Sequence, residues 1–280
     1  KEKEYHNLPS QFIEDIKSSV ENDSVLDELE TSILKDGKWI LMTGNPGSGK
    51  SLNIATFNPS GNISILGKYF TKVPNDDIPR TLRTSMRYFL TWLEEIISFT
   101  LHGKSFPKED KSIEDRIKRL PSLFEDLNSF YKEKSQVGVL LIDGVDEIES
   151  LSDFLGILNF SLPDTIRIVL SCTSQEILPS DIKNYFDEDQ IIKVTPIDIA
   201  KCEYFVLKEI GKERLSVEYI QQLANKSEGH PLYLRYLTNI VKNEENLNND
   251  NFNEWIETIP EIAGDIENYY NTIWDRIYQD

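Results

Sequence analysis

The chain has 280 residues, of which 39% are hydrophobic and 28% are charged, so it is long enough to bury one large core or two modest ones. It carries 30 Lys and Arg residues against 48 Asp and Glu residues, which gives a formal net charge of −18. This charge disfavours a broad surface for nucleic acid or anionic membrane, because phosphate groups would be repelled. The first residue is Lys1 rather than Met, so we expect the chain to be part of a longer protein.

The two cysteines, Cys172 and Cys202, fall in a predicted core strand and a predicted helix. This placement indicates small buried thiols in a reducing compartment rather than a disulfide. The sequence shows neither a signal peptide nor an apolar stretch long enough to span a bilayer. We therefore predict a cytoplasmic protein that makes no contact with a membrane.

The first half of the chain alternates between helical and strand patterns. Apolar residues at helical spacing predict one or two helices within 10–35, and the apolar run 39–43 predicts a buried strand. A second strand is predicted at 63–70, one long amphipathic helix at 80–101, and another helix at 113–131.

Three further strands are predicted at 137–142, 166–172 and 190–194. The first two are almost wholly apolar, as is typical of parallel strands that helices cover on both faces. Strands that alternate with helices indicate an α/β fold with a parallel sheet of five strands.

Strand patterns stop after Pro196. Three helices are then predicted, at 199–211, 216–227 and 232–242, and they form a small all-helical domain. The Asn- and Glu-rich stretch 243–254 is predicted to be a solvated loop, with helix from Trp255 onward.

Residues 44–51 read GNPGSGKS and match the P-loop pattern G-x-x-x-x-G-K-[ST] between a predicted strand and a predicted helix. In such a loop glycines let the backbone curl around phosphates, and amide groups and the helix dipole face the anion. Lys50 is predicted to reach the outer phosphates and Ser51 to bind Mg²⁺. The nucleotide contacts predicted here are Gly44, Asn45, Pro46, Gly47, Ser48, Gly49, Lys50, Ser51 and Leu52.

The apolar strand 137–142 is followed directly by Asp143-Gly144-Val145-Asp146-Glu147. Ligands of open α/β sheets bind at the carboxyl ends of the strands, so Asp143 is predicted to hold Mg²⁺ opposite Ser51. Asp146 or Glu147 could act as the general base that polarises an attacking water. The alternative interpretation makes these two acids a helix N-terminus that the dipole favours.

The strand 166–172 leads into three polar residues, Thr173, Ser174 and Gln175. If this strand lies between the P-loop strand and the strand that ends at Asp143, one of the three could bind a phosphate or the attacking water. Polar residues also simply end strands, and both interpretations stay open. Neither arginine nor lysine occurs among them.

Together, the P-loop, the segment LLIDGVDE and the later Gly229-His230-Pro231 resemble the STAND class of signal-transduction ATPases, most of all its NACHT and bacterial NLR-like antiviral branches. The resemblance implies a P-loop NTPase of the ASCE type, with a five-stranded parallel sheet and a helical lid. It also implies that Pro231 contacts the adenine and that His230 reaches the phosphates, although a solvent-facing histidine remains the alternative for His230.

The resemblance further implies four segments: linker helices at 1–36, a nucleotide-binding domain at 37–197, a lid at 198–258, and the incomplete start of a winged-helix domain at 259–280. It predicts a slow Mg²⁺-dependent ATPase that holds ADP or ATP and oligomerises through neighbouring NTPase domains on activation. Effector and sensor domains are expected outside this chain.

Two alternatives remain. One is an AAA+ ATPase that handles DNA, such as an origin-binding or clamp-loader subunit. Such proteins usually have glutamate directly after the Walker B aspartate, where this chain has Gly144. The other is a scaffold locked by nucleotide that never hydrolyses it.

Overall fold

The computed structural model describes residues 20–35, 37–73, 77–104, 112–244, 247 and 249–259. The chain divides into two compact units. Among the described residues, the first unit holds 23–35, 37–43 and 50–193, and the second holds 20–22, 44–49 and residues from 194 onward. Most of the predicted linker segment and of the predicted winged-helix start lies outside the described residues.

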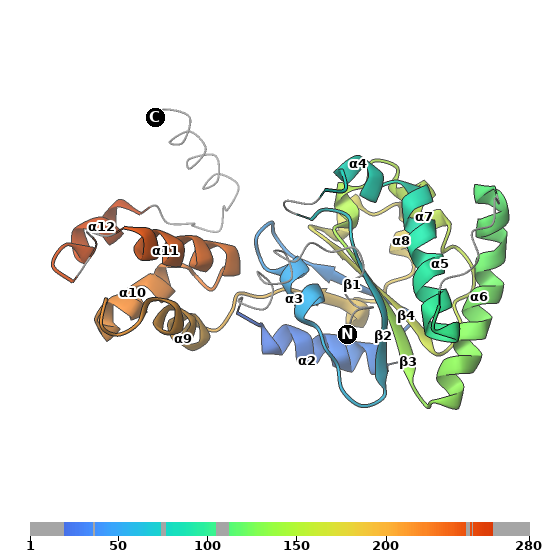
Figure 1. Cartoon of the computed structure of the whole chain (residues 1–280), viewed down its shortest axis with the longest axis horizontal. Helices are drawn as coiled ribbons and strands as arrows, with labels where there is room; N and C mark the ends of the chain where they lie inside the picture. Colours follow the sequence, from blue (N-terminus) through green and yellow to red (C-terminus); the bar gives the residue numbers. More distant parts are fainter. Residues whose placement is uncertain are drawn as a thin grey trace. The chain divides into compact units, whose positions relative to one another are not determined.

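The first unit is built on a five-stranded parallel sheet with the strand order β2-β3-β4-β1-β5 (Figure 1). The predicted α/β sheet is therefore confirmed. Its strands are β1 (Trp39–Thr43), β2 (Ile63–Phe70), β3 (Val137–Asp143), β4 (Ile166–Cys172) and β5 (Ile191–Lys193). β4 lies between β3 and β1, the arrangement on which the possible role of its polar end depends.

Helices cover both faces of this sheet. Ile168 and Leu170 of β4 belong to a core cluster that also contains apolar residues of α5 and α6. Arg167 precedes Ile168 on β4, so its side chain lies on the other face of the sheet. Its guanidinium donates hydrogen bonds to the main-chain oxygens of Ile33 and Lys35, at the end of α2. Because side chains alternate along a strand, α2 and α5–α6 lie on opposite faces. The helices are α2 (Asp23–Leu34), α3 (Lys50–Thr56), α4 (Arg80–Arg83), α5 (Met86–His102), α6 (Ile113–Glu133), α7 (Leu151–Gly156) and α8 (Ser180–Lys183).

The helix predicted over 80–101 is two helices, α4 and α5, which is a correction to the prediction from periodicity. The hydroxyl of Ser85 accepts a hydrogen bond from the N–H of Tyr88 at 3.3 Å and so caps the start of α5. The periodic apolar pattern continues across this point, but the N-cap serine starts a new helix. The described part of this unit also contains three short 3-10 turns: η1 (Val145–Glu147), η2 (Gln175–Ile177) and η3 (Glu188–Gln190).

A buried lysine of β2 fastens α3 to the sheet. Lys68 is 3% exposed, and its ammonium donates to the main-chain oxygens of Ala55 at 2.8 Å and Phe57 at 2.7 Å. These carbonyls belong to the C-terminal end of α3, where the last turn of a helix lacks its own donors. The contact holds that end of α3 against β2.

Among the described residues of the second unit, four helices surround an apolar core: α9 (Ile199–Ile210), α10 (Val217–Lys226), α11 (Pro231–Asn243) and α12 (Phe252–Thr258). The predicted solvated loop at 243–254 is wrong at its end. Phe252 begins α12 and is fully buried, with its ring stacked 4.6 Å from that of Tyr219. Because the stretch is rich in Asn and Glu, its composition does not indicate that Phe252 is buried.

Candidate functional site

The loop 44–49 joins β1 to α3, and its backbone includes two glycines in the left-handed region. Gly47 has φ 78° and Gly49 has φ 99°, both in the left-handed region that favours glycine. The N–H of Ser48 donates to the carbonyl of Asn45 at 3.1 Å. The Ser48 hydroxyl is buried and has no partner among the described residues. An unsatisfied buried hydroxyl costs about 1–3 kcal/mol, so the loop fits a polar ligand that would satisfy it.

Directly after this loop, α3 begins with the two predicted phosphate and metal ligands, Lys50 and Ser51. Ser51 hydrogen-bonds the carboxylate of Asp143, which is 4% exposed at the end of β3. The two predicted metal ligands, one from α3 and one from β3, therefore lie in contact. Lys50 lies close enough to interact electrostatically with Asp143 and with Asp146.

Burial shifts the protonation of both charged groups toward neutrality. Burial raises the pKa of the Asp143 carboxyl, while hydrogen bonds from Ser171 and Ser51 and the charge of Lys50 oppose that rise. Burial lowers the pKa of Lys50, and the negative charges of Asp146 and Asp143 oppose that fall. For both groups, burial is the largest cause of the shift in pKa.

Two hydroxyls hold the chain where it leaves β3. From β4, the fully buried Ser171 donates to Oδ1 of Asp143 and accepts the N–H of Gly144 at 3.0 Å. From β2, Oγ1 of Thr71 lies 3.0 Å from the carbonyl oxygen of Asp143 and 2.8 Å from that of Gly144. Gly144 has φ 71°, and a Cβ there would lie 2.6 Å from Oγ1 of Thr71. A side chain at residue 144 would therefore be strained and would have to displace the Thr71 hydroxyl.

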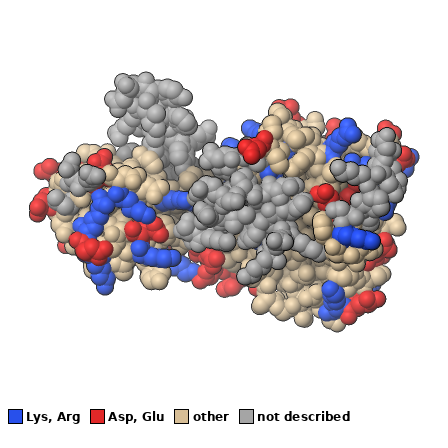
Figure 2. All heavy atoms as spheres, viewed as in Figure 1, with Lys and Arg blue, Asp and Glu red and all other residues tan. Residues whose placement is uncertain are grey.

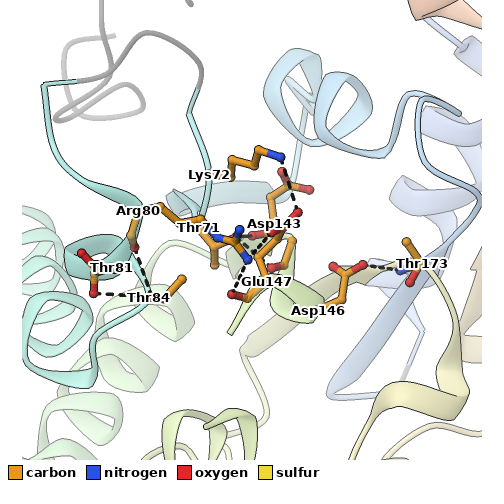
Figure 3. Close-up of polar contacts among 10 residues, drawn as sticks. Thr71, Lys72, Arg80, Thr81, Thr84, Asp143, Asp146, Glu147 and Thr173 are labelled. Carbon is orange, nitrogen blue, oxygen red and sulfur yellow. Dashed lines mark hydrogen bonds and ion pairs between the residues drawn. The ribbon is translucent and has the colours of Figure 1, made fainter. Parts of the chain in front are cut away.

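Beyond this turn, the two neighbouring acids lie in different surroundings (Figure 3). Asp146 points toward β4, where its Oδ2 accepts the N–H of Thr173 at 3.1 Å. Glu147 instead forms ion pairs with Arg80 at 2.5 Å and with Lys72 at 3.8 Å. Arg80 also donates to the main-chain oxygen of Glu147. Asp146, not Glu147, therefore shares the neighbourhood of Lys50 and Asp143.

The polar end of β4 contributes to this site through its backbone. The Thr173 amide binds Asp146, while the hydroxyl of Ser174 accepts the N–H of Glu176 at 3.2 Å and caps η2. Cys172 is a free buried thiol whose pKa burial raises to about 12, so it is inert. Cys202 is likewise free and buried, as the sequence predicts.

The other predicted nucleotide ligands, His230 and Pro231, lie in the second unit at the start of α11. The carbonyl of Gly229 accepts the N–H of Ile197 at 2.8 Å, which fixes this turn against the segment that enters the unit. Nδ1 of His230 is buried without a partner among the described residues, and burial lowers the pKa of the ring. A contact of His230 or Pro231 with nucleotide stays a prediction.

A protein-only metal cage is absent from the described part of the chain, where no three His, Cys, Asp or Glu side chains cluster. Mg²⁺ retains several waters and commonly takes one or two carboxylates plus phosphate oxygens. A single buried carboxylate beside a hydroxyl, Asp143 with Ser51, fits this chemistry.

Sequence patterns did not single out Ser171, Thr71, Lys72 or Arg80. Ser171 and Thr71 lie within or directly after strands, where a hydroxyl resembles an ordinary strand residue. One signal was available for Ser171: it follows the apolar run Ile168–Leu170 close to the carboxyl end of the strand IRIVLSC. For Arg80, nothing in the local sequence points to Glu147, which lies 67 residues away.

No family model matches the sequence, and no curated protein does. Among solved structures, a Walker-type ATPase of Pyrococcus abyssi is similar, with a TM-score of 0.53 and 16% identity over 91% of this chain and 75% of that one. Cdc6p from Pyrobaculum aerophilum has a TM-score of 0.49 and 12% identity over 80% of this chain. The chain spans 65% of the length of that Cdc6p.

The topology and the first of these similarities define the fold. A five-stranded parallel sheet flanked by helices, with a P-loop between β1 and α3 and a helical C-terminal part, is the P-loop NTPase fold. Among the described residues, none of the helices combines the length and hydrophobicity that crossing a bilayer needs.

Proposed function

We propose that the chain binds ATP with Mg²⁺, hydrolyses it slowly, and serves as the nucleotide-controlled switch of a larger STAND-class protein. The observation that carries the proposal is the contact of Ser51 with the buried carboxylate of Asp143, beside Lys50 and directly after a glycine-rich turn. Lys50 would bind the outer phosphates, and Ser51 and Asp143 would hold Mg²⁺. The metal would neutralise phosphate charge during transfer to water.

For hydrolysis, we assign the general base to Asp146. Its carboxylate interacts electrostatically with Lys50, and the Thr173 amide fixes its orientation at 3.1 Å. In this role Asp146 orients a water and accepts its proton. Glu147 is paired with two cations and instead anchors the segment that follows β2. The sequence leaves the choice between these two acids open, and the geometry favours Asp146.

The geometry of Gly144 favours this class over the AAA+ alternative. Glutamate directly after Asp143 would need a left-handed backbone and would collide with Thr71. Figure 2 also shows acidic side chains interspersed with Lys and Arg over the described residues of the face it presents. Such a mixed surface lacks the clustered positive charge that duplex DNA attracts.

The switch follows from the same resemblance. A nucleotide that contacted both Lys50 of the first unit and the Gly229-His230-Pro231 turn of the second would bind two conformations differently, which is what a population shift requires. We propose that a change of the bound nucleotide lets neighbouring NTPase domains self-associate. Domains outside this chain would supply the trigger and the effector, and the resemblance to bacterial NLR-like proteins supports a role in antiviral defence.

Single-turnover hydrolysis of labelled ATP tests this function with a matched pair of variants. Asp146→Asn is expected to slow the reaction by about 100-fold or more, the usual contribution of a general base. Glu147→Gln is expected to stay within a few-fold of the unsubstituted protein, because Glu147 faces Arg80. If both variants hydrolyse at the unsubstituted rate, the hydrolytic assignment is wrong.

A further inference from the structure

The carboxylate of Asp143 has two hydroxyl partners of different kinds. Ser51 comes from α3 and is itself a predicted metal ligand. Ser171 comes from β4, is 0% exposed, and is enclosed by the sheet. The strand pairing places it there, because Ile142 of β3 is opposite Leu170 of β4, so the next residues of the two strands are neighbours. Ser171 therefore contacts Asp143 from the side away from solvent.

The Ser171 hydroxyl acts both as a hydrogen-bond donor and as an acceptor. Its O–H donates to Oδ1 of Asp143, and its oxygen accepts the N–H of Gly144 at 3.0 Å. One hydroxyl thus fixes the side chain of Asp143 and the peptide that follows it. Thr71, directly after β2, also binds this segment, but its hydroxyl contacts the main-chain oxygens of Asp143 and Gly144 and not the Asp143 carboxylate. Orientation of the carboxylate from within the sheet depends on Ser171.

We propose that Ser171 is a positioning residue that orients the Asp143 carboxylate for Mg²⁺, so that the gain in ATP affinity given by the metal depends on it. This inference rests on the proposed nucleotide site. Partners that orient a metal ligand typically contribute 10- to 100-fold in metal affinity, although they do not touch the metal.

Calorimetric titration of ATP into the whole chain, with Mg²⁺ and separately with EDTA, tests the proposal. Ser171→Ala is expected to reduce the Mg²⁺-dependent gain in affinity by about 10-fold or more. Its affinity in EDTA is expected to stay within about 2-fold, because Lys50 and the P-loop amides are intact. Ser171→Thr keeps the hydroxyl, and it is expected to recover most of the gain.

Ser98→Ala is the matched control. Ser98 is also 0% exposed and donates its hydroxyl to a main-chain oxygen, but it lies on α5. This variant should lose a similar amount of thermal stability and keep the full Mg²⁺ effect. If Ser171→Ala is too unstable to titrate, the proposal is tested with Ser171→Cys, whose thiol is a weaker donor, and an intermediate gain is expected.

Two results would overturn the proposal. One is a Mg²⁺-dependent gain in Ser171→Ala equal to that of the unsubstituted chain. The other is an equal loss with Mg²⁺ and in EDTA, which would mark Ser171 as structural only. In either case, a Lys50→Ala protein that has lost ATP binding leaves the proposed function intact. Unchanged ATP affinity in Lys50→Ala would remove the proposed function itself.

Discussion

Gly229 shows how a single residue can fix a turn in the second unit. It has φ 74°, and a Cβ there would lie 2.4 Å from the carbonyl oxygen and 2.9 Å from the nitrogen of Ile197. Side-chain ends can move away from such a contact, but this main chain is held by the hydrogen bond between Ile197 and Gly229. Glycine is therefore required for two reasons: the left-handed backbone conformation, and the close approach of the Ile197 main chain.

We expect Gly229→Ala to lower the free energy of unfolding by more than the left-handed conformation alone costs. Gly61→Ala is the matched control, because Gly61 has φ 72° and nothing within 4 Å of its missing Cβ. The control should lose about 1–2 kcal/mol, and Gly229→Ala clearly more, in urea unfolding. Equal losses in the two variants would show that the contact with Ile197 contributes nothing.

His230 gives the stability a dependence on pH with a defined sign. Burial lowers its pKa below the ordinary value of 6.5, while the charge of Glu228 opposes that shift. Between the folded and unfolded values the unfolded chain binds more protons, so stability falls as the pH decreases through this window. Above pH 6.5, where the imidazole is neutral in the folded and the unfolded chain, protonation of His230 no longer lowers the stability.

Urea unfolding of the unsubstituted chain and of His230→Gln, at pH 8 and at pH 5.5, measures this contribution. The unsubstituted chain is expected to lose more stability between the two pH values than the variant does. The acidic groups and the other two histidines are common to both proteins, so they cancel in the comparison. A variant with the same loss as the unsubstituted chain would contradict the assignment.

At the scale of single residues, the sequence identifies the side chains that belong to the two motifs. Lys50, Ser51 and Asp143 follow from the spacing of two motifs, and the structure brings Ser51 into contact with Asp143. The different surroundings of Asp146 and Glu147 could not be predicted, because they depend on Thr173 and Arg80, which are distant in the chain. A motif gives the order of residues but not which neighbouring strand each faces.

At the scale of secondary structure, α3 is the element whose placement matters most. It is seven residues long and starts at Lys50. Isolated helices of this length are unstable in water, so tertiary contacts must hold α3 in place. The ammonium of Lys68 on its last turn is one such contact. We infer that Lys68 fixes α3 from the end opposite to the nucleotide.

Lys68→Met is expected to lower the free energy of unfolding by about 1–3 kcal/mol, because two buried carbonyls lose their donor. Lys193→Met serves as control, since Lys193 is exposed on β5, and it should change stability by less than about 0.5 kcal/mol. Denaturant unfolding followed by circular dichroism measures both. A difference smaller than the error of the fit would remove this role of Lys68.

Long apolar patterns predict elements well, whereas boundaries depend on single polar or apolar residues. The five strands fall within one or two residues of their predicted positions. For β1, β3 and β4 the reason is that parallel strands covered on both faces are largely apolar. The break between α4 and α5 depends on the hydroxyl of Ser85. The start of α12 depends on one buried ring, Phe252, in a polar stretch. Neither Ser85 nor Phe252 can be distinguished as a boundary residue from the residues around it in the sequence.

At the scale of the whole molecule, the chain combines a parallel sheet of the P-loop NTPase fold with a separate helical core. Each of the two cores is apolar and buried, so each unit has its own source of hydrophobic stabilisation. A division of this kind suits a switch, in which a ligand that contacts both parts favours one arrangement. The proposed signalling role depends on this property and on domains outside the chain.

The central claim is that the P-loop turn and Lys50 bind the phosphates of ATP. Isothermal titration of ATP with Mg²⁺ into the unsubstituted chain and into Lys50→Ala tests it most directly, with Lys134→Ala as a surface control. The account predicts saturable binding to the unsubstituted chain and to the control, and at least a tenfold weaker affinity for Lys50→Ala, as expected for a lost charge-assisted contact of about 1.5–3 kcal/mol. Equal affinity of all three proteins, or no binding to any of them, would contradict it.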